Sequence, residues 1–128
     1  MVGPCSIHDL DAAIDYARRL QVLREKRQGE LEIVMRTYFE KPRTGSGWKG
    51  LISDPDLNGS YRVNHGIEQA RELLLQVNTL GVPTATKFLD MVTGQFIANL
   101  IAGRNWRANH GEPDSPRNGF RSLFVRWV

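Results

Sequence analysis

A cationic loop near the middle of the sequence holds the residue types best suited to chemistry. It follows an apolar run and carries four cations among a proline and three glycines: Arg36, Lys41, Arg43 and Lys49. Guanidinium and ammonium groups bind phosphate and carboxylate, so the stretch predicts an anion site. A solvated basic loop without a ligand fits the same composition, and both interpretations stay open at this point.

The composition is that of a soluble protein with one hydrophobic core. The chain has 128 residues, of which 41% are hydrophobic and 24% charged. It has no apolar run close to the ~20 residues of a membrane span and no signal-peptide pattern, so we expect no membrane partner. The single cysteine, Cys5, cannot form an internal disulfide, which favours a cytoplasmic protein.

Hydrophobic periodicity predicts the elements that position this loop. Apolar residues recur at helical spacing in three stretches. The strand predicted at Leu31–Phe39 begins with a nearly continuous apolar run, which favours a parallel strand covered on both faces. Residues 1–5 fit the end of a further strand. The predicted helices are Leu10–Arg27, Gly66–Thr79 and Thr93–Ile101, and the strands are Leu31–Phe39 and Val82–Leu89. The order β-α-β-α-β-α predicts an α/β protein with a parallel sheet.

The pattern changes after Ile101. Residues 102–128 show no sustained period and contain five arginines against two acids. We therefore predict an ordered unit over residues 1–101 and an irregular C-terminal tail over residues 102–128. A small basic nucleic-acid-binding module, formed by the tail and the cationic loop, is the alternative, but it lacks a fold motif for that function.

Four motifs resemble one enzyme family. The motifs, in chain order, are Gly3–Asp9, Arg36–Thr44, Gly47–Ile52 and Phe88–Met91. Together they closely resemble the microbial class I 3-deoxy-D-arabino-heptulosonate-7-phosphate (DAHP) synthases, the first enzymes of the shikimate pathway of aromatic amino acid biosynthesis. The run Asp90–Ala98 looks most like the tryptophan-sensitive isozyme.

The resemblance implies a (β/α)8 TIM barrel that condenses phosphoenolpyruvate with erythrose 4-phosphate around a divalent metal. The intact enzymes are homo-oligomers, and nucleic acid is not among their partners. Such a barrel needs about 250 residues, so this chain is expected to form an N-terminal fragment of about three βα units. Three units cannot close a barrel, so we expect Val34, Phe39 and Phe88 to stay exposed on its inner face.

The resemblance also implies roles for individual residues. Cys5 matches a metal ligand, and Arg36 matches an arginine that binds phosphoenolpyruvate. Lys41 would bind substrate and donate a hydrogen bond or proton to the aldehyde oxygen. The loop that holds erythrose 4-phosphate corresponds to Pro42, Arg43 and Thr44. The metal would polarise the aldehyde, the enol carbon would attack it, and water would add before phosphate leaves. We expect His8 and Trp48 to have packing roles.

The sequence also departs from the family pattern. Lys87 stands where the family has a glutamate that faces the active site, which reverses a charge beside a cationic pocket. Gly45 and Ser46 replace a pair that is usually apolar or β-branched, which loosens the substrate loop. The family's downstream metal ligands, a histidine and two acids, have no counterpart. We therefore predict that this chain is catalytically incomplete.

The tail is compatible with translation in another reading frame. Trp106–His110 can be encoded by codons that, read one base later, give Gly-Ala-Arg-Thr-Thr, which is the family sequence after the third helix. Ser115–Arg121 can likewise yield His-Arg-Glu-Met-Ala-Ser-Ala, and the spacing of the two blocks agrees with the family's. We therefore expect residues 102–128 to be an out-of-frame product of a DAHP synthase gene.

Overall fold

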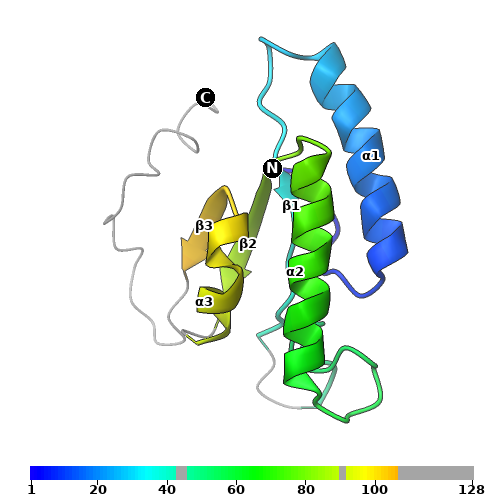
Figure 1. Cartoon of the computed structure of the whole chain (residues 1–128), viewed down its shortest axis with the longest axis vertical. Helices are drawn as coiled ribbons and strands as arrows, with labels where there is room; N and C mark the ends of the chain where they lie inside the picture. Colours follow the sequence, from blue (N-terminus) through cyan, green and yellow to red (C-terminus); the bar gives the residue numbers. More distant parts are fainter. Residues whose placement is uncertain (43–45, 90–91, 107–128) are drawn as a thin grey trace.

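Helices and strands alternate along the chain, as the periodicity predicts (Figure 1). The computed structural model describes residues 1–42, 46–89 and 92–106, and only the backbone of residues 103–106. The α-helices are α1 (Leu10–Lys26), α2 (Val63–Thr79) and α3 (Thr93–Ile97), which a 3-10 turn, η1 (Ala98–Leu100), extends. The strands are β1 (Met35–Arg36), β2 (Thr84–Phe88) and β3 (Gly103–Trp106).

The strands form one parallel sheet in the order β1-β2-β3. Met35 pairs with Thr84, and Ala85 pairs with Gly103. The N-terminal segment extends the sheet beside β1, because Val2 forms a parallel bridge with Met35. This bridge supports the interpretation of residues 1–5 as the end of a strand. Parallel strands joined through helices give the predicted α/β arrangement.

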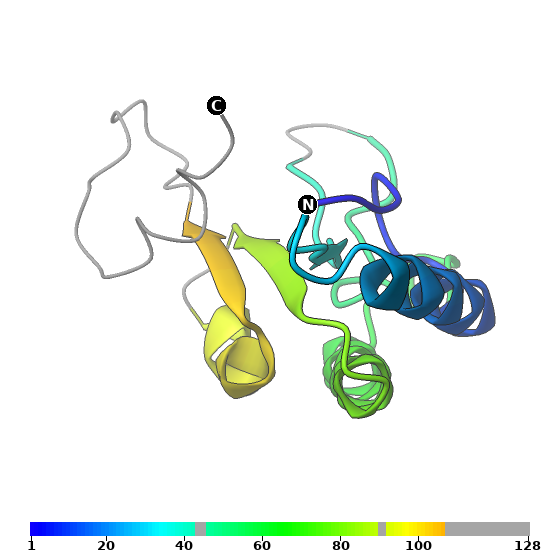
Figure 2. The ribbon, with the colours of Figure 1, turned by 90° about the horizontal axis from the view of Figure 1, so that it is seen from above.

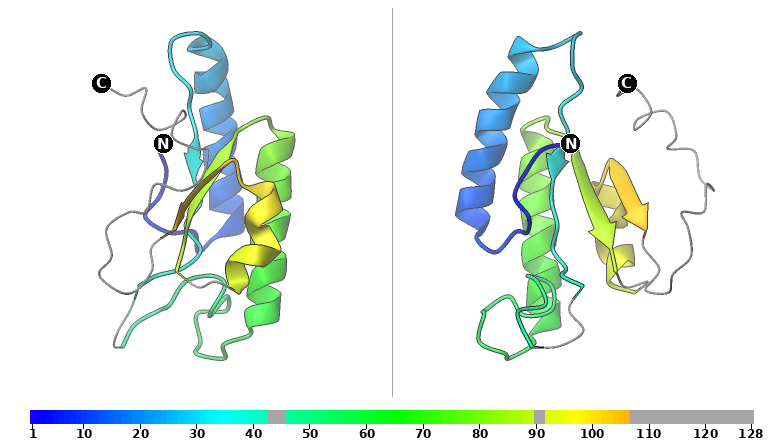
Figure 3. Two further views of the ribbon diagram at one scale, coloured as in Figure 1. Left: turned by 90° about the vertical axis from the view of Figure 1, so that its left-hand side faces the viewer. Right: turned by 180° about the vertical axis from the view of Figure 1, so that it is seen from behind.

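All three described helices lie on the same side of the sheet (Figure 2). Helix α1 packs against α2, and α2 packs against both α3 and β2, as the views in Figure 3 also show. The core lies between these helices and the strands. Its buried members are Ile7, Ala13, Ala17, Leu20, Met35, Phe39, Leu51, Ile52, Ala70, Leu73, Leu74, Val77, Val82, Phe88 and Ile97.

Local sequence signals explain where the helices begin and end. The Asp9 side chain caps α1 by accepting a hydrogen bond from the Ala12 backbone N–H at 2.9 Å. Helix α2 begins at Val63, three residues before the predicted start at Gly66. Gly66 is needed for close packing instead, because a Cβ there would lie 2.4 Å from the Ile52 carbonyl oxygen. Gly81, with φ +75°, follows the end of α2.

Two expectations about exposure and order are wrong. Phe39 and Phe88 are 1% and 2% exposed, because their side chains face the helices rather than the uncovered side of the sheet. Val34 alone of the three expected residues is partly exposed. The tail was expected to be irregular from Ala102, but residues 103–106 form β3. Neighbouring strands pair through their backbone N–H and C=O groups. A strand can therefore form without a regular spacing of apolar side chains.

In the part of the chain that the structure describes, no helix is both long and apolar enough to cross a membrane.

Candidate functional site

The candidate site begins at β1, where buried and partly exposed residues alternate. Met35 and Thr37 are 0% exposed and Phe39 is 1% exposed, and these three side chains face the helices. Arg36 and Tyr38 are partly exposed and point to the opposite side, because successive side chains of a strand alternate between faces. The side of the sheet without helices therefore carries the arginine predicted to bind an anion.

The register of β2 adds Lys87 to that side. Arg36 pairs with Ala85, so the side chains of both residues lie on the same face. Lys87 follows Ala85 by two residues and is partly buried, whereas Thr86 and Phe88 are 2% exposed and face the helices. Lys87 thus lies on the same face of the sheet as Arg36.

Arg36 is held in place but retains an unused donor. Its guanidinium carbon lies 3.9 Å from the centroid of the Tyr38 ring, in cation–π geometry. Its backbone N–H donates to the Val2 carbonyl at 2.9 Å. The Nε atom is buried and has no hydrogen-bond partner among the described residues. A buried N–H without an acceptor costs about 1–3 kcal/mol, so an incoming anion would gain by accepting from it.

Cys5 and Lys41 meet at the C-terminal ends of the neighbouring segments. The Lys41 ammonium donates a hydrogen bond to Cys5 Sγ at 2.9 Å, although the two residues are 36 positions apart. The Lys41 backbone N–H donates to the Lys49 carbonyl at 2.9 Å, which closes the base of the cationic loop. Cys5 is exposed, and a lysine neighbour stabilises the thiolate form of a cysteine.

The other residues predicted for the loop differ in their exposure, and some lie outside the described residues. Pro42 is exposed, while Arg43 and Thr44 lie outside the described residues, as does Gly45. Trp48 packs against the core and donates from Nε1 to the Asp54 carbonyl at 2.7 Å, so its predicted packing role is confirmed.

His8 is exposed, so the packing role predicted for it is wrong. It sits one residue before the Asp9 cap of α1, on the solvent side of the turn.

Glu40 is a structural residue of the site that the sequence analysis missed. One carboxylate oxygen accepts from the Leu89 backbone N–H at 3.1 Å, and the other accepts from the Thr93 hydroxyl at 3.2 Å. These contacts connect the residue before Lys41 to the end of β2 and the start of α3. The sequence could have indicated this role, because Glu40 is a carboxylate among the cations of the Arg36–Thr44 motif.

The described residues do not form a complete metal site. Nowhere in ranges 1–42, 46–89 and 92–106 do three or more histidine, cysteine, aspartate or glutamate side chains gather in a way that could hold a metal ion. Cys5 offers one sulfur ligand, which accepts a hydrogen bond from the Lys41 ammonium. One ligand does not hold a divalent ion, because such sites use several protein donors.

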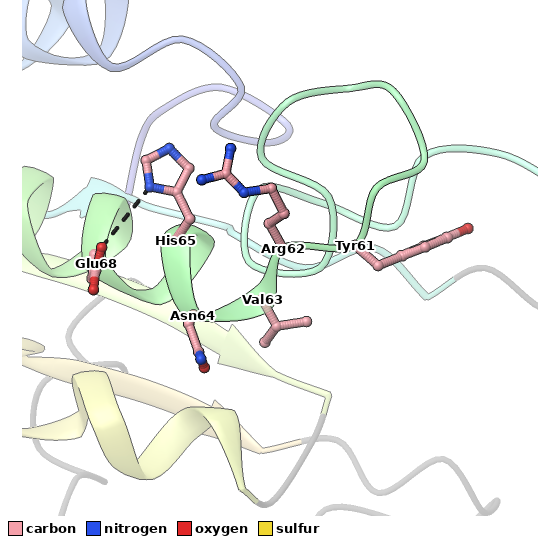
Figure 4. Close-up of a pocket in the computed structure, with 6 residues that line it drawn as sticks. All are labelled: Tyr61, Arg62, Val63, Asn64, His65 and Glu68. Carbon is pink, nitrogen blue, oxygen red and sulfur yellow. Dashed lines mark ion pairs between the residues drawn. The ribbon is translucent and has the colours of Figure 1, made fainter.

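A separate open hollow of about 520 Å³ lies at the N-terminal end of α2 (Figure 4). Its lining residues are Tyr61, Arg62, Val63, Asn64, His65 and Glu68. His65 Nδ1 lies 3.9 Å from a Glu68 carboxylate oxygen, and Arg62 pairs with Asp56 at 3.3 Å. None of the predicted site residues lines this hollow. Arg62 and Glu68 are exposed, so the contacts that they make here are weak.

Comparisons with known proteins place the chain in one family. The model of the DAHP synthetase I family matches residues 1–104. Tryptophan-sensitive phospho-2-dehydro-3-deoxyheptonate aldolases from Escherichia coli and Salmonella typhi are 79% and 78% identical to it over 102 residues. The match covers 80% of this chain and 29% of each relative, so the chain spans less than a third of their length.

A solved structure supports the same grouping. The phospho-2-dehydro-3-deoxyheptonate aldolase of Francisella tularensis is 53% identical and superposes with a TM-score of 0.77. The superposition covers 80% of this chain and 30% of that protein. Family model, sequence relatives and solved structure therefore agree, and this chain belongs to the DAHP synthetase I family.

Proposed function

We propose that this chain carries the phosphoenolpyruvate-binding part of a DAHP synthase site and is catalytically incomplete by itself. The observation that carries the proposal is the buried Arg36 Nε, which has no acceptor among the described residues. A guanidinium fork binds a planar carboxylate or a phosphate through two parallel hydrogen bonds. Phosphoenolpyruvate offers both groups on a small molecule, which suits a partly buried arginine.

Lys41 is the proposed catalytic residue. Its ammonium group would donate a hydrogen bond or a proton to the aldehyde oxygen of erythrose 4-phosphate as negative charge develops there. The loop residues Pro42, Arg43 and Thr44 would hold the phosphate of that substrate. Glu40 would keep this loop in place through its contacts with Leu89 and Thr93.

We propose that the N-terminal segment beside β1, β1 itself and β2 are part of a (β/α)8 barrel. Parallel strands with helices on one side are the arrangement of a barrel wall, whose site lies at the C-terminal ends of the strands. Cys5 and Lys41 lie beyond those ends, as the proposal requires. In the complete barrel Cys5 would supply one ligand to a divalent metal, and the other ligands would come from outside the described residues.

Lys87 distinguishes this chain from the family pattern. Its side chain lies on the Arg36 face, and the resemblance implies a carboxylate at this position in the family. A second cation on this face favours anion binding but cannot accept a proton as a carboxylate can. We propose that Lys87 weakens the catalytic step, which involves water, and does not weaken phosphoenolpyruvate binding.

Replacing Arg36 with glutamine tests the binding proposal. The Arg36→Gln variant is expected to bind phosphoenolpyruvate about 10- to 100-fold more weakly than the unaltered chain, the range of one or two charged hydrogen bonds. Isothermal titration of phosphoenolpyruvate into each purified chain measures this ratio. Arg18→Gln, at an exposed position on α1, removes the same charge away from the site and is expected to leave binding unchanged.

Two outcomes would contradict this proposal. Equal affinity of the Arg36→Gln variant and the unaltered chain would remove Arg36 from the site. A salt-dependent shift of a DNA or RNA probe, together with no phosphoenolpyruvate binding, would favour the nucleic-acid alternative. Circular dichroism of both variants checks that the helices are retained.

We also propose that residues 102–128 are translated out of frame. The family match ends at residue 104, so residues 105–128 lie outside it, which supports an out-of-frame origin for most of this stretch. Sequencing the gene from the codon of Phe96 onward is expected to show, in a neighbouring frame, codons for Gly-Ala-Arg-Thr-Thr followed by family sequence. Absence of that run from both alternative frames would contradict the proposal.

A further inference from the structure

The loop that precedes α2 contains one of the two Asn-Gly pairs of the sequence (Figure 1). Asn58 and Gly59 are both exposed, whereas the other pair, Asn118–Gly119, lies outside the described residues. An asparagine before a glycine is open to attack by the next backbone nitrogen, because glycine has no side chain to hinder the approach. A Cβ at Gly59 would have no heavy atom within 4 Å, so the space around this peptide is open.

The backbone nitrogen of Gly59 lies against a carboxylate that could act as a base. Its N–H donates to both carboxylate oxygens of Asp54, each at 3.1 Å. Asp54 is 6% exposed, and its backbone is held from two sides. Its N–H donates to the Gly50 carbonyl at 2.9 Å, and its carbonyl accepts from the Trp48 indole at 2.7 Å. A carboxylate fixed on an N–H can take that proton while the nitrogen attacks a carbon atom.

The side-chain carbonyl of Asn58 is polarised for such an attack. Asn58 Oδ1 accepts a hydrogen bond from the Ser60 backbone N–H at 2.9 Å. This donor lies where negative charge develops on the oxygen, as in an oxyanion hole. The bond also closes a turn around the Gly59 peptide, which keeps the Asn58 carboxamide beside the Gly59 nitrogen. Leu57 and Tyr61 have φ of +57° and +51°, strained values that persist only where surrounding contacts hold the backbone.

We propose that Asn58 is a site of spontaneous deamidation, promoted by the Asp54 carboxylate. The Gly59 nitrogen forms a bond to Asn58 Cγ while its proton passes to Asp54. The Cγ–Nδ2 bond then breaks, and Nδ2 leaves as ammonia with that proton. Water opens the resulting cyclic imide at either carbonyl, which gives aspartate or isoaspartate. The product adds a negative charge to a loop that already holds Asp54 and Asp56. This proposal does not depend on the proposed function, since none of these residues belongs to the substrate site.

Peptide mapping by mass spectrometry tests the proposal. The purified chain and a synthetic peptide of residues 52–64 would be incubated in the same neutral buffer and sampled over several days. The peptide has the same covalent sequence without the contacts of the folded chain. We expect Asn58 to deamidate about 10-fold faster in the chain than in the peptide, below the ~100-fold that a well-placed general base contributes. An equal or slower rate in the chain would overturn the proposal.

A pair of matched variants identifies the base. Asp54→Asn removes the acceptor of the Gly59 N–H and is expected to slow deamidation at Asn58 about 10-fold. Asp56→Asn makes the same charge change on the same loop, but Asp56 contacts the Ser60 hydroxyl and Arg62 instead. It is expected to leave the rate within about 2-fold.

The rate at Asn118, measured in the same samples, serves as the internal reference for both variants. Equal slowing at Asn58 in both variants, or slowing in neither, would contradict the assigned base. Circular dichroism checks that the helices are retained. The comparison of the unaltered chain with the peptide decides the proposal if Asp54→Asn does not fold.

Discussion

Replacing Gly50 with alanine is expected to lower the free energy of unfolding by about 3 kcal/mol. Gly50 has φ +108°, a conformation that side chains with a Cβ rarely adopt. A Cβ there would lie 2.2 Å from the Phe39 carbonyl oxygen and 2.7 Å from the Glu40 Cα. Both neighbours are backbone atoms, so neither can move away without shifting the strand that leads to Lys41.

Gly29→Ala is the matched control for this prediction. Gly29 has a similar φ of +92°, but a Cβ there would have no heavy atom within 4 Å. Its replacement is expected to cost about 1 kcal/mol, from backbone strain alone. Urea unfolding followed by circular dichroism gives both values. Equal losses in the two variants would show that the contact with Phe39 has no effect on stability.

The predicted loss at Gly50 has a consequence for the site. Lys41 N–H donates to the carbonyl of Lys49, the residue immediately before Gly50. A shift of the Gly50 backbone therefore weakens the contact that closes the cationic loop. The Lys41 ammonium, 2.9 Å from Cys5 Sγ, would move with that loop.

The order of elements was predictable from sequence, but the direction of some side chains was not. Helical spacing located α1 and α2 to within three residues, because amphipathic helices have a clear period. Phe39 and Phe88 were assigned to the wrong face of the sheet. Nearly continuous apolar strands do not show which face the helices cover, so the register of β1 and β2 was needed.

The site residues illustrate a second limit. Arg36 was identified from its place at the end of an apolar run, and the structure confirms that it lies at the end of β1. The contact between Cys5 and Lys41 spans 36 positions and depends on the parallel pairing of Val2 with Met35. Periodicity does not reveal contacts of that range. The tethering role of Glu40 was missed for the same reason, since its partners Leu89 and Thr93 lie far along the chain.

The chain by itself is expected to form no 3-deoxy-7-phosphoheptulonate, and this is the largest effect predicted here. The match covers 29% of the Escherichia coli relative, and the described residues supply one sulfur ligand but no group that could hold a metal. Lys41 and Arg36 would be present without the other groups of a barrel site. Substrate binding without turnover is therefore expected.

The most direct test is an assay of the purified 128-residue chain with phosphoenolpyruvate, erythrose 4-phosphate and manganese. The full-length Escherichia coli relative, assayed in parallel, verifies the reagents. We predict product at the level of the blank for the chain and clear formation for the relative. Substrate-dependent product from the chain, retained through a final size-exclusion step, would contradict the claim that the chain is catalytically incomplete by itself.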